Sequence, residues 1–347
     1  MKSLNYLRLV IFILSAITLE SCASFRNNPS SVVVKHIARP NSEFQELWSR
    51  SDIHIVAVPL SPSYSVGANS GIVCFVGILD YRQKNNSVNC LNGKTGDVLW
   101  VNDANSSTNF IFVPDGIYVE RDGGGGGVTK YDLKGNTVWV NYTWGSGILY
   151  MYLIDNQLQV SVYPPKLVGL NVFDGKQVVQ YLKGEEAFIS TPIDTFINES
   201  NSKLKAVLLE SGQTKWETKI PGGLRAPPIF LDHVIILRSG DVMGSIYAID
   251  RASGDILWKT EIGVISNIGY SVNHNKIYYL TKEGKLLGSD INTGTESVLV
   301  DFTPAPFTTL NEENVGAYNV AFDDTTNILY AIIGDSMQLF AFKENSP

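Results

Sequence analysis

Short apolar runs alternate with clusters of turn-forming residues along most of the chain. Runs of four to six apolar residues bounded by Gly, Asp, Asn and Ser favour β-strands over helices. The clearest example contains three apolar runs and a final strand, at 228–231, 234–238, 245–250 and the residues leading to Trp258. This pattern predicts units of four short antiparallel strands.

Six segments repeat one motif, in which a large apolar residue follows a glycine by four positions. The glycines are Gly96, Gly135, Gly175, Gly212, Gly254 and Gly294, and the apolar residues are Trp100, Trp139, Val179, Trp216, Trp258 and Val298. The glycines are 39, 40, 37, 42 and 40 residues apart. A period near forty with strand-like content is typical of β-propeller blades.

The residue types of the motif suit a hairpin that ends in a packing contact. Asn92, Asn171, Asp250 and Asp290 lie four residues before their glycines, where a short polar side chain bonds turn amides. The glycine supplies a positive φ, and the Trp is expected to be buried against the neighbouring sheet. Val179 and Val298 fill this position less completely, which predicts looser packing of blades three and six.

The two ends of the chain complement each other. Residues 44–50 include Trp48 and resemble a fourth strand with nothing before it, whereas 317–322, 328–333 and 337–342 supply three strands with nothing after them. Pairing the two ends closes the ring and removes open sheet edges. We therefore expect an all-β, seven-bladed propeller in which the N-terminal strand completes the last blade, with eight blades as the alternative.

The N-terminus has the features of an export signal. Lys2 and Arg8 precede a short apolar run at residues 9–17, and Ser21-Cys22 follows. The run is too short to cross a bilayer and indicates a signal peptide. The segment before Cys22 resembles a lipoprotein signal, which implies that Cys22 is acylated, although Glu20 departs from that pattern. An ordinary cleavage site before residue 24 is the alternative. We divide the chain into a signal peptide (1–21), a tether (22–42) and a propeller (43–347).

The motif Asp-x-x-x-Gly-x-x-x-Trp, most complete at residues 250–258, resembles the PQQ-like repeat, and this resemblance covers residues 44–342. A single propeller behind a lipoprotein signal is similar to the BamB family of outer-membrane assembly factors. That resemblance implies a non-catalytic, monomeric scaffold that binds a protein partner in the cell envelope, on an outer-membrane lipoprotein facing the periplasm. The family has eight blades, where the present count gives seven. Secretion or display on the cell surface is the alternative location.

Composition and charge narrow the functional classes. The formal charge is −7, which argues against a nucleic-acid partner. The four histidines show no ligand spacing, so no metal site is predicted. Quinone-dependent dehydrogenases share the repeat but have adjacent cysteines, which this chain lacks, so we expect neither enzymatic activity nor a cofactor. The glycine run at 123–127 is followed by a strand and is interpreted as a loop.

Cys74 and Cys90 are expected on consecutive strands of blade one. A cross-strand disulfide and a pair of small buried apolar side chains are both compatible with their positions.

One face of the ring is predicted to bind the partner. Loops between the second and third strands of a blade, and links between blades, emerge on the same face. Aromatic and arginine side chains are enriched at binding hot spots. The candidates on this face are Arg121, Tyr142, Trp144, Arg225 and Arg238. A surface-exposed module that binds glycans or host molecules is the alternative function.

Overall fold

The structure, a computed structural model, describes residues 35–345 apart from short gaps. The residues outside the description are 54–65, 80–86, 103–105, 122–125, 143–147, 155, 163–165, 184–186, 192–193, 200–201, 209, 225–227, 241–243, 262, 306–317 and 335–336. The predicted signal peptide and Cys22 also lie outside the described residues. Within the described part of the chain, every regular element is a β-strand.

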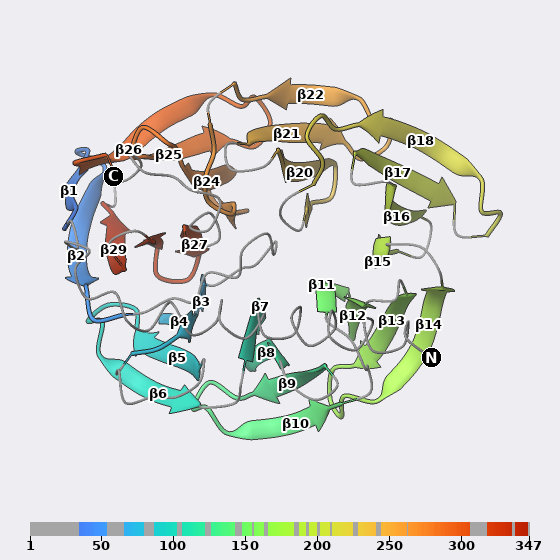
Figure 1. The fold of residues 1–347 in the computed structure, drawn as a ribbon, viewed down its shortest axis with the longest axis horizontal. Coiled ribbons are helices and arrows are strands. Elements are labelled where there is room, and N and C mark those ends of the chain that lie inside the picture. The colour runs from blue at the N-terminus through green and yellow to red at the C-terminus, as the bar shows by residue number, and fades with distance from the viewer. Residues whose placement is uncertain are drawn as a thin grey trace, which may run out of the picture. The chain divides into compact units, whose positions relative to one another are not determined.

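Seven antiparallel sheets are arranged in a ring (Figure 1), and their inner strands line a central channel. From the channel outward, blades one to three contain β3 (Val66–Asn69), β4 (Ile72–Gly77), β5 (Ser87–Asn92) and β6 (Val98–Asn102); β7 (Ser106–Val113), β8 (Gly116–Arg121), β9 (Gly127–Tyr131) and β10 (Thr137–Asn141); and β11 (Ile148–Ile154), β12 (Gln157–Val162), β13 (Lys166–Asn171) and β14 (Gln177–Lys183).

Blades four to six continue the same order. They contain β15 (Ala187–Ser190), β16 (Asp194–Glu199), β17 (Lys203–Leu208) and β18 (Thr214–Lys219); β19 (Ile229–Phe230), β20 (Val234–Ser239), β21 (Ser245–Asp250) and β22 (Ile256–Lys259); and β23 (Gly269–Ser271), β24 (Lys276–Leu280), β25 (Lys285–Asp290) and β26 (Glu296–Thr303). Blade seven contains β27 (Asn319–Asp323), β28 (Ile328–Ile333), β29 (Gln338–Glu344) and β2 (Phe44–Arg50). The prediction of a seven-bladed propeller is confirmed.

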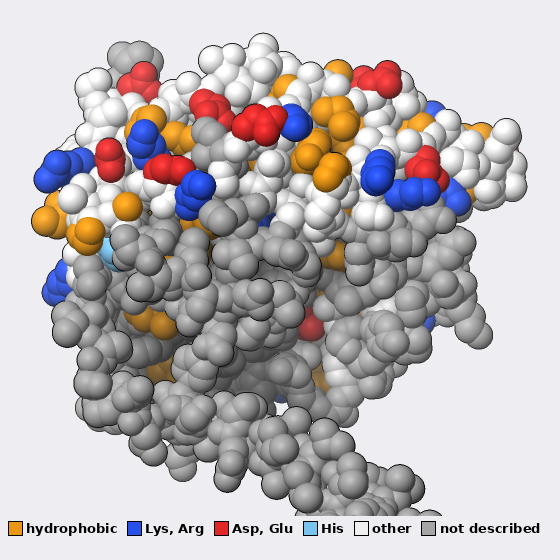
Figure 2. All heavy atoms as spheres, turned by 45° about the horizontal axis from the view of Figure 1, so that its top comes forward, with side chains coloured by type: hydrophobic (Ala, Val, Ile, Leu, Met, Phe, Trp, Pro, Cys, Tyr) orange, Lys and Arg blue, Asp and Glu red, His pale blue; other side chains and the backbone are white. Residues whose placement is uncertain are grey.

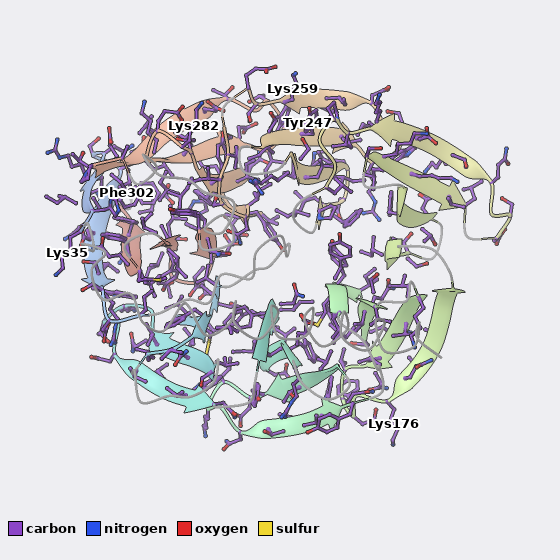
Figure 3. The ribbon with its side chains drawn as sticks, viewed as in Figure 1. Lys35, Lys176, Tyr247, Lys259, Lys282 and Phe302 are labelled. Atoms are coloured by element: carbon purple, nitrogen blue, oxygen red, sulfur yellow. A yellow bond between two sulfur atoms is a disulfide. The ribbon has the colours of Figure 1, made fainter. Side chains whose placement is uncertain are left out.

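The two ends of the chain meet in blade seven, as predicted. β2 pairs with β29 from Phe44 opposite Glu344 to Arg50 opposite Leu339. Close to this junction the core is aromatic: the rings of Phe302 and Phe340 lie 5.2 Å apart, edge to face. Figure 3 shows Phe302 inside the ring, whereas Lys176 and Lys259 lie on its outer rim. The last blade is therefore built from both termini of the propeller.

A further strand, β1 (Ile37–Pro40), was not predicted. It lies within the stretch interpreted as a tether, yet it pairs with β26 from Ile37 opposite Thr303 to Pro40 opposite Val300 and makes blade six five-stranded. The buried His36 holds its start, because its amide donates to Oε1 of Gln338 at 2.7 Å. The propeller therefore begins before residue 43. The sequence did not predict β1 because residues 37–40 lie in a polar stretch of the chain. The contacts that stabilise this strand are mostly backbone hydrogen bonds.

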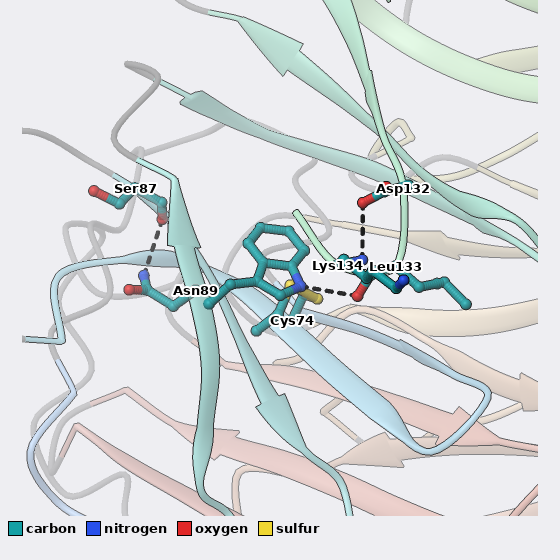
Figure 4. Close-up of a disulfide and its surroundings, with 8 residues drawn as sticks. Cys74, Ser87, Asn89, Asp132, Leu133 and Lys134 are labelled. Atoms are coloured by element: carbon teal, nitrogen blue, oxygen red, sulfur yellow. Dashed lines mark hydrogen bonds between the residues drawn. A yellow bond between two sulfur atoms is a disulfide. The ribbon is translucent and has the colours of Figure 1, made fainter. Parts of the chain in front are cut away.

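Blade one contains the disulfide that the sequence left open. Cys74 of β4 and Cys90 of β5 lie directly opposite each other, 4.1 Å apart at Cα, and are bonded. Both are fully buried between blades one and two. Cys90 lies opposite Trp100 of β6, so the disulfide lies next to the strand whose indole contacts blade two (Figure 4).

Candidate functional site

The hairpins between the third and fourth strands of the blades form as the repeat predicted. The Oδ1 atom of Asp250 accepts hydrogen bonds from the amides of Ala252 and Ser253 at 2.9 and 2.7 Å. The bond from Ser253 is the main reason why the pKa of Asp250 is lowered. Equivalent bonds start the hairpins at Asn92, Asp132, Asn171 and Asp290. The six repeat glycines all have positive φ, from 67° to 86°.

Each repeat tryptophan reaches into the hairpin of the following blade. The indole N–H of Trp139 donates to the carbonyl oxygen of Val172 at 3.0 Å, and this bond joins blade two to blade three. The other four bonds have the same form and run from Trp48 to Gly93, Trp100 to Leu133, Trp216 to Arg251 and Trp258 to Ile291, at 2.8–3.1 Å. Each indole packs against the neighbouring blade as predicted, but only Trp139 and Trp216 are buried, whereas Trp48, Trp100 and Trp258 are half-buried.

The glycine of each hairpin also leaves a space, the seat, that the indole of the preceding blade occupies. A Cβ placed on Gly175 would lie 2.5 Å from the ring of Trp139. Trp48, Trp100, Trp216 and Trp258 lie equally close to Gly96, Gly135, Gly254 and Gly294. The motif therefore needs glycine both for the turn and for the space above it, and the second reason was not predicted.

A second tie between blades, also missed, comes from the residue two positions after the tryptophan. Nδ2 of Asn141 donates to the carbonyl oxygen of Gly175 at 2.6 Å, and Oγ1 of Thr218 donates to that of Gly254 at 2.5 Å. Nη1 of Arg50 donates in the same way to Gly96 at 2.7 Å. The signal was available in the sequence, since a polar donor follows most repeat tryptophans at this spacing.

The junction between blades three and four lacks the wedge that a repeat tryptophan forms between two neighbouring blades. Val179 stands in place of tryptophan, and among the described residues no atom lies within 4 Å of where a Cβ on Gly212 would be. Instead, the buried side chain of Gln159 exchanges two hydrogen bonds with the backbone of Ser190, at 2.6 and 2.7 Å. The expectation of looser packing at Val179 agrees with this vacant seat.

Blade six departs from the prediction. In blade five, Leu257 is the extra residue of a β-bulge and Trp258 pairs with Ala248, whereas in blade six the extra residue is Leu299 and Val298 pairs with Leu287. The displaced bulge turns Val298 outward, where 44% of it is exposed beside a surface cavity of about 480 Å³. Leu299 is fully buried in the core shared with blade seven. The prediction that Val298 loosely fills the wedge position is therefore wrong.

Two of the predicted partner residues come together on one face. Arg121 ends the second strand of blade two, Tyr142 begins the link to blade three, and the guanidinium carbon lies 5.3 Å from the ring centre. Tyr142 is 63% exposed. This geometry is a cation–π contact, which holds both side chains at the surface. Trp144 and Arg225 lie outside the described residues.

Arg238 does not belong to an exposed surface. Its side chain is buried, and Nε and Nη2 donate to the carbonyl oxygen of Val264 at 3.2 and 3.0 Å. Val264 lies in the link from blade five to blade six, so Arg238 ties this link to its blade. Sequence alone could not distinguish this arginine from an exposed one, because its acceptor is a backbone atom of a distant segment.

The inner strands of the blades line a channel of about 630 Å³. Its walls are mainly aromatic and aliphatic, including Phe112, Tyr152, Phe230 and Tyr270, with Asn109 and Asp324 among the polar residues. The rings of Tyr152 and Phe230 meet edge to face at 5.4 Å. Such a wall can hold apolar side chains, and Asp324 is the one carboxylate among the described residues that line it.

The described residues contain no group of three or more His, Cys, Asp or Glu placed to hold a metal ion. The strongly shifted side chains are buried tyrosines; burial raises the pKa of Tyr118 to about 12, so its hydroxyl stays protonated. No described helix has the length and apolar character to cross a membrane. The candidate site is the face of the ring that displays Arg121 and Tyr142.

Comparison with known protein families gives one match that spans most of the ring. The family model described as outer membrane protein assembly factor BamB matches residues 45–207 and 194–319. These residues include all six repeat glycines and all five repeat tryptophans.

Two relatives and one solved structure illustrate the similarity. Outer membrane protein assembly factor BamB of Yersinia pestis is 22% identical over 319 residues, which cover 80% of this chain and 77% of that protein. The Escherichia coli protein of the same name is 27% identical over 122 residues, covering 33% of this chain and 31% of the relative. The WD40 domain of Neurospora crassa Pan2 has a TM-score of 0.59 at 10% identity, covering 88% and 97% of the two chains, and shares the fold.

Proposed function

Because this chain belongs to the family of the outer membrane protein assembly factor BamB, we propose that it is a non-catalytic scaffold in outer-membrane protein assembly. The observation that carries the proposal is the family match across the whole set of repeats. In this role the ring binds a protein partner in the cell envelope and holds it in place.

The non-catalytic part of the proposal is supported by what the repeat residues do. The indoles, the hairpin glycines and the donors that follow each tryptophan are engaged between blades. Their chemistry builds a rigid platform. We expect no substrate-dependent dye reduction after incubation with pyrroloquinoline quinone and Ca²⁺; a quinone-dependent activity would contradict this part of the proposal.

The proposed docking surface is the face that displays Arg121 and Tyr142. An exposed aromatic ring held beside a guanidinium is well suited to the centre of a protein interface, since Tyr and Arg are frequent hot-spot residues. Trp144 and Arg225 are proposed members of the same surface, by their positions in the chain.

The test is affinity purification of the tagged protein from detergent-solubilised envelopes, with the outer-membrane assembly components identified by mass spectrometry. We expect these components to co-purify with the wild-type protein and to be lost with the double variant Arg121→Glu, Tyr142→Ala. The matched control is Lys176→Glu, an exposed charge reversal on a hairpin of the opposite face. Equal recovery with all three proteins would exclude this docking surface, and failure of the wild-type protein to recover any component would contradict the proposed function.

We further propose that acylation of Cys22 anchors the protein to the outer membrane on its periplasmic side. Cys22→Ser should abolish labelling with a palmitate analogue and release the protein into the soluble periplasmic fraction. Unchanged labelling would show that the lipid is attached elsewhere.

A further inference from the structure

The outer edge of blade six shows that this propeller accepts an additional strand. β1 adds to β26 over four residues in antiparallel register. Asn41 then closes the pairing, because its amide donates to the carbonyl oxygen of Leu299 at 2.8 Å and its side chain donates to that of Val298 at 2.9 Å. The outermost strand of a blade is therefore a working template for strand addition in this chain.

The outermost strands of the other blades differ in how strongly they discourage pairing. β18 alternates charges, with Lys215, Glu217 and Lys219, and β22 ends in Lys259. Charged residues on an edge strand are a common protection against unwanted pairing. Figure 2 shows side chains of both charge signs along the rim of blades four to six.

The outermost strands of blades one and two lack charged residues, and β6 of blade one exposes more apolar side chains than β10, with Leu99 as the extra residue of its β-bulge. β6 contains no charged residue, and three of its apolar side chains, Val98, Leu99 and Val101, are 46%, 47% and 40% exposed. β6 ends its sheet, with no further described strand beside it. An exposed, uncharged, apolar edge indicates a site where another extended chain binds.

The edge strand of blade one is also held in place by the strands and the blade next to it. The disulfide joins β4 to β5, and Cys90 lies opposite Trp100 of β6. The indole of Trp100 is in turn fixed to blade two by its bond to Leu133. A template that is already ordered loses little conformational entropy when a strand is added, which favours binding.

We propose that the outer edge of β6 binds an extended segment of an unfolded β-barrel protein by antiparallel strand addition. The inference rests on the proposed function, which supplies clients of this kind, and it names their binding site. Strands of membrane β-barrels alternate apolar and polar residues, so one face of a bound segment covers Val98 and Leu99 while the other faces solvent. Backbone hydrogen bonds supply affinity without requiring one particular sequence.

The test uses the full-length protein and a fluorescent peptide of about ten residues with alternating Val and Thr, the length of one membrane-spanning strand. A second peptide has the same side chains but carries N-methyl groups on alternate backbone nitrogens. Fluorescence anisotropy should show binding of the first peptide and at least about tenfold weaker binding of the second, because several backbone hydrogen bonds are lost. Equal binding of both peptides would overturn the proposal.

The variant pair places charges at identical repeat positions of two blades. Val98→Lys, Leu99→Lys should weaken peptide binding about tenfold or more, whereas Ile256→Lys, Leu257→Lys on β22 should change it by less than about twofold. All four side chains are 45–48% exposed, so both variants should fold, which circular dichroism checks. Equal losses in both variants would contradict the assignment to blade one.

A last measurement separates this inference from the proposed function. Hydrogen exchange of the β6 amides should slow when the unmodified peptide is bound, and co-purification of the assembly components should persist in the β6 variant. Absence of peptide binding while the components still co-purify would remove the inference and leave the function intact. Failure of the wild-type protein to co-purify them would instead contradict the function.

Discussion

The hairpin glycines satisfy two requirements at one position, and a matched pair of substitutions separates them. Gly175→Ala introduces a Cβ at positive φ, which costs about 1–2 kcal/mol, and forces it against the indole of Trp139, which costs about 1–3 kcal/mol more. Gly212→Ala incurs only the first cost, because its seat is empty. Urea unfolding should therefore show a larger loss of unfolding free energy for Gly175→Ala, and equal losses would indicate that the seat relaxes freely.

Where an aspartate starts the hairpin, its side chain makes stability depend on pH. Hydrogen bonds from the turn amides lower the pKa of Asp250 in the folded state. The stabilisation is therefore complete above the unfolded-state pKa of about 3.9 and is lost as pH falls through the lower folded-state pKa. Asp250→Asn should lower the melting temperature at pH 6 and converge with the wild-type protein near pH 2.

The converse substitution is the control for this prediction. Asn92 accepts the same amide bonds in blade one, from Lys94 and Thr95 at 2.9 and 3.2 Å. Asn92→Asp should therefore gain an acid-sensitive contribution that the wild-type hairpin lacks. Melting curves of Asn92→Asp that parallel the wild type between pH 6 and pH 2 would contradict this account.

At the scale of the strand, the wedge after each glycine decides how firmly two blades are joined. Val179→Trp should place an indole over Gly212 and raise the unfolding free energy by about 1 kcal/mol, since the seat is already open. Val298→Trp is the matched control, because Val298 faces the surface cavity and its substitution should give no stabilisation. Calorimetry of the two variants measures the difference, and equal melting temperatures would refute it.

How much of the structure of each blade could be predicted depends on which interactions determine it. The period of glycine and tryptophan was sufficient for the blades, since local turn chemistry and burial act together there. The bulge of blade six was not predictable, because moving one extra residue from position 297 to 299 turns Val298 to the other face without changing composition. Arg238 was misassigned because its acceptor is a backbone carbonyl in the link between blades five and six, a contact that the sequence does not reveal.

At the scale of the whole molecule, the two N-terminal strands differ in importance: β2 closes the ring, whereas β1 only extends blade six. A chain that begins at Asn41 loses β1 but keeps β2, and should fold with an unfolding free energy reduced by about 2 kcal/mol, the worth of a few backbone hydrogen bonds. A chain that begins at Ile53 loses the closing strand and leaves β29 as an apolar edge. We expect this chain to aggregate instead of folding.

Circular dichroism, melting curves and size exclusion of the two truncated proteins measure this prediction. The pairing of β2 with β29 was predictable, because complementary incomplete units stood at the two ends of the sequence. β1 was not, because Ile37–Pro40 carries neither the repeat motif nor an apolar alternation, and its pairing partner is 260 or more residues away. A folded, monomeric chain beginning at Ile53 would mean that six complete blades suffice.

The direction of β1 also orients the molecule. Ile37 lies opposite Thr303, at the end of β26 from which the link to the next blade departs, so the start of β1 lies on the same face as Arg121 and Tyr142. Fourteen residues lie between Cys22 and Ile37, and a chain of this length reaches at most about 50 Å when fully extended. With the proposed acyl chain on Cys22, this face would lie toward the bilayer. The Asp-to-Gly hairpins on the opposite face would then point into the aqueous space.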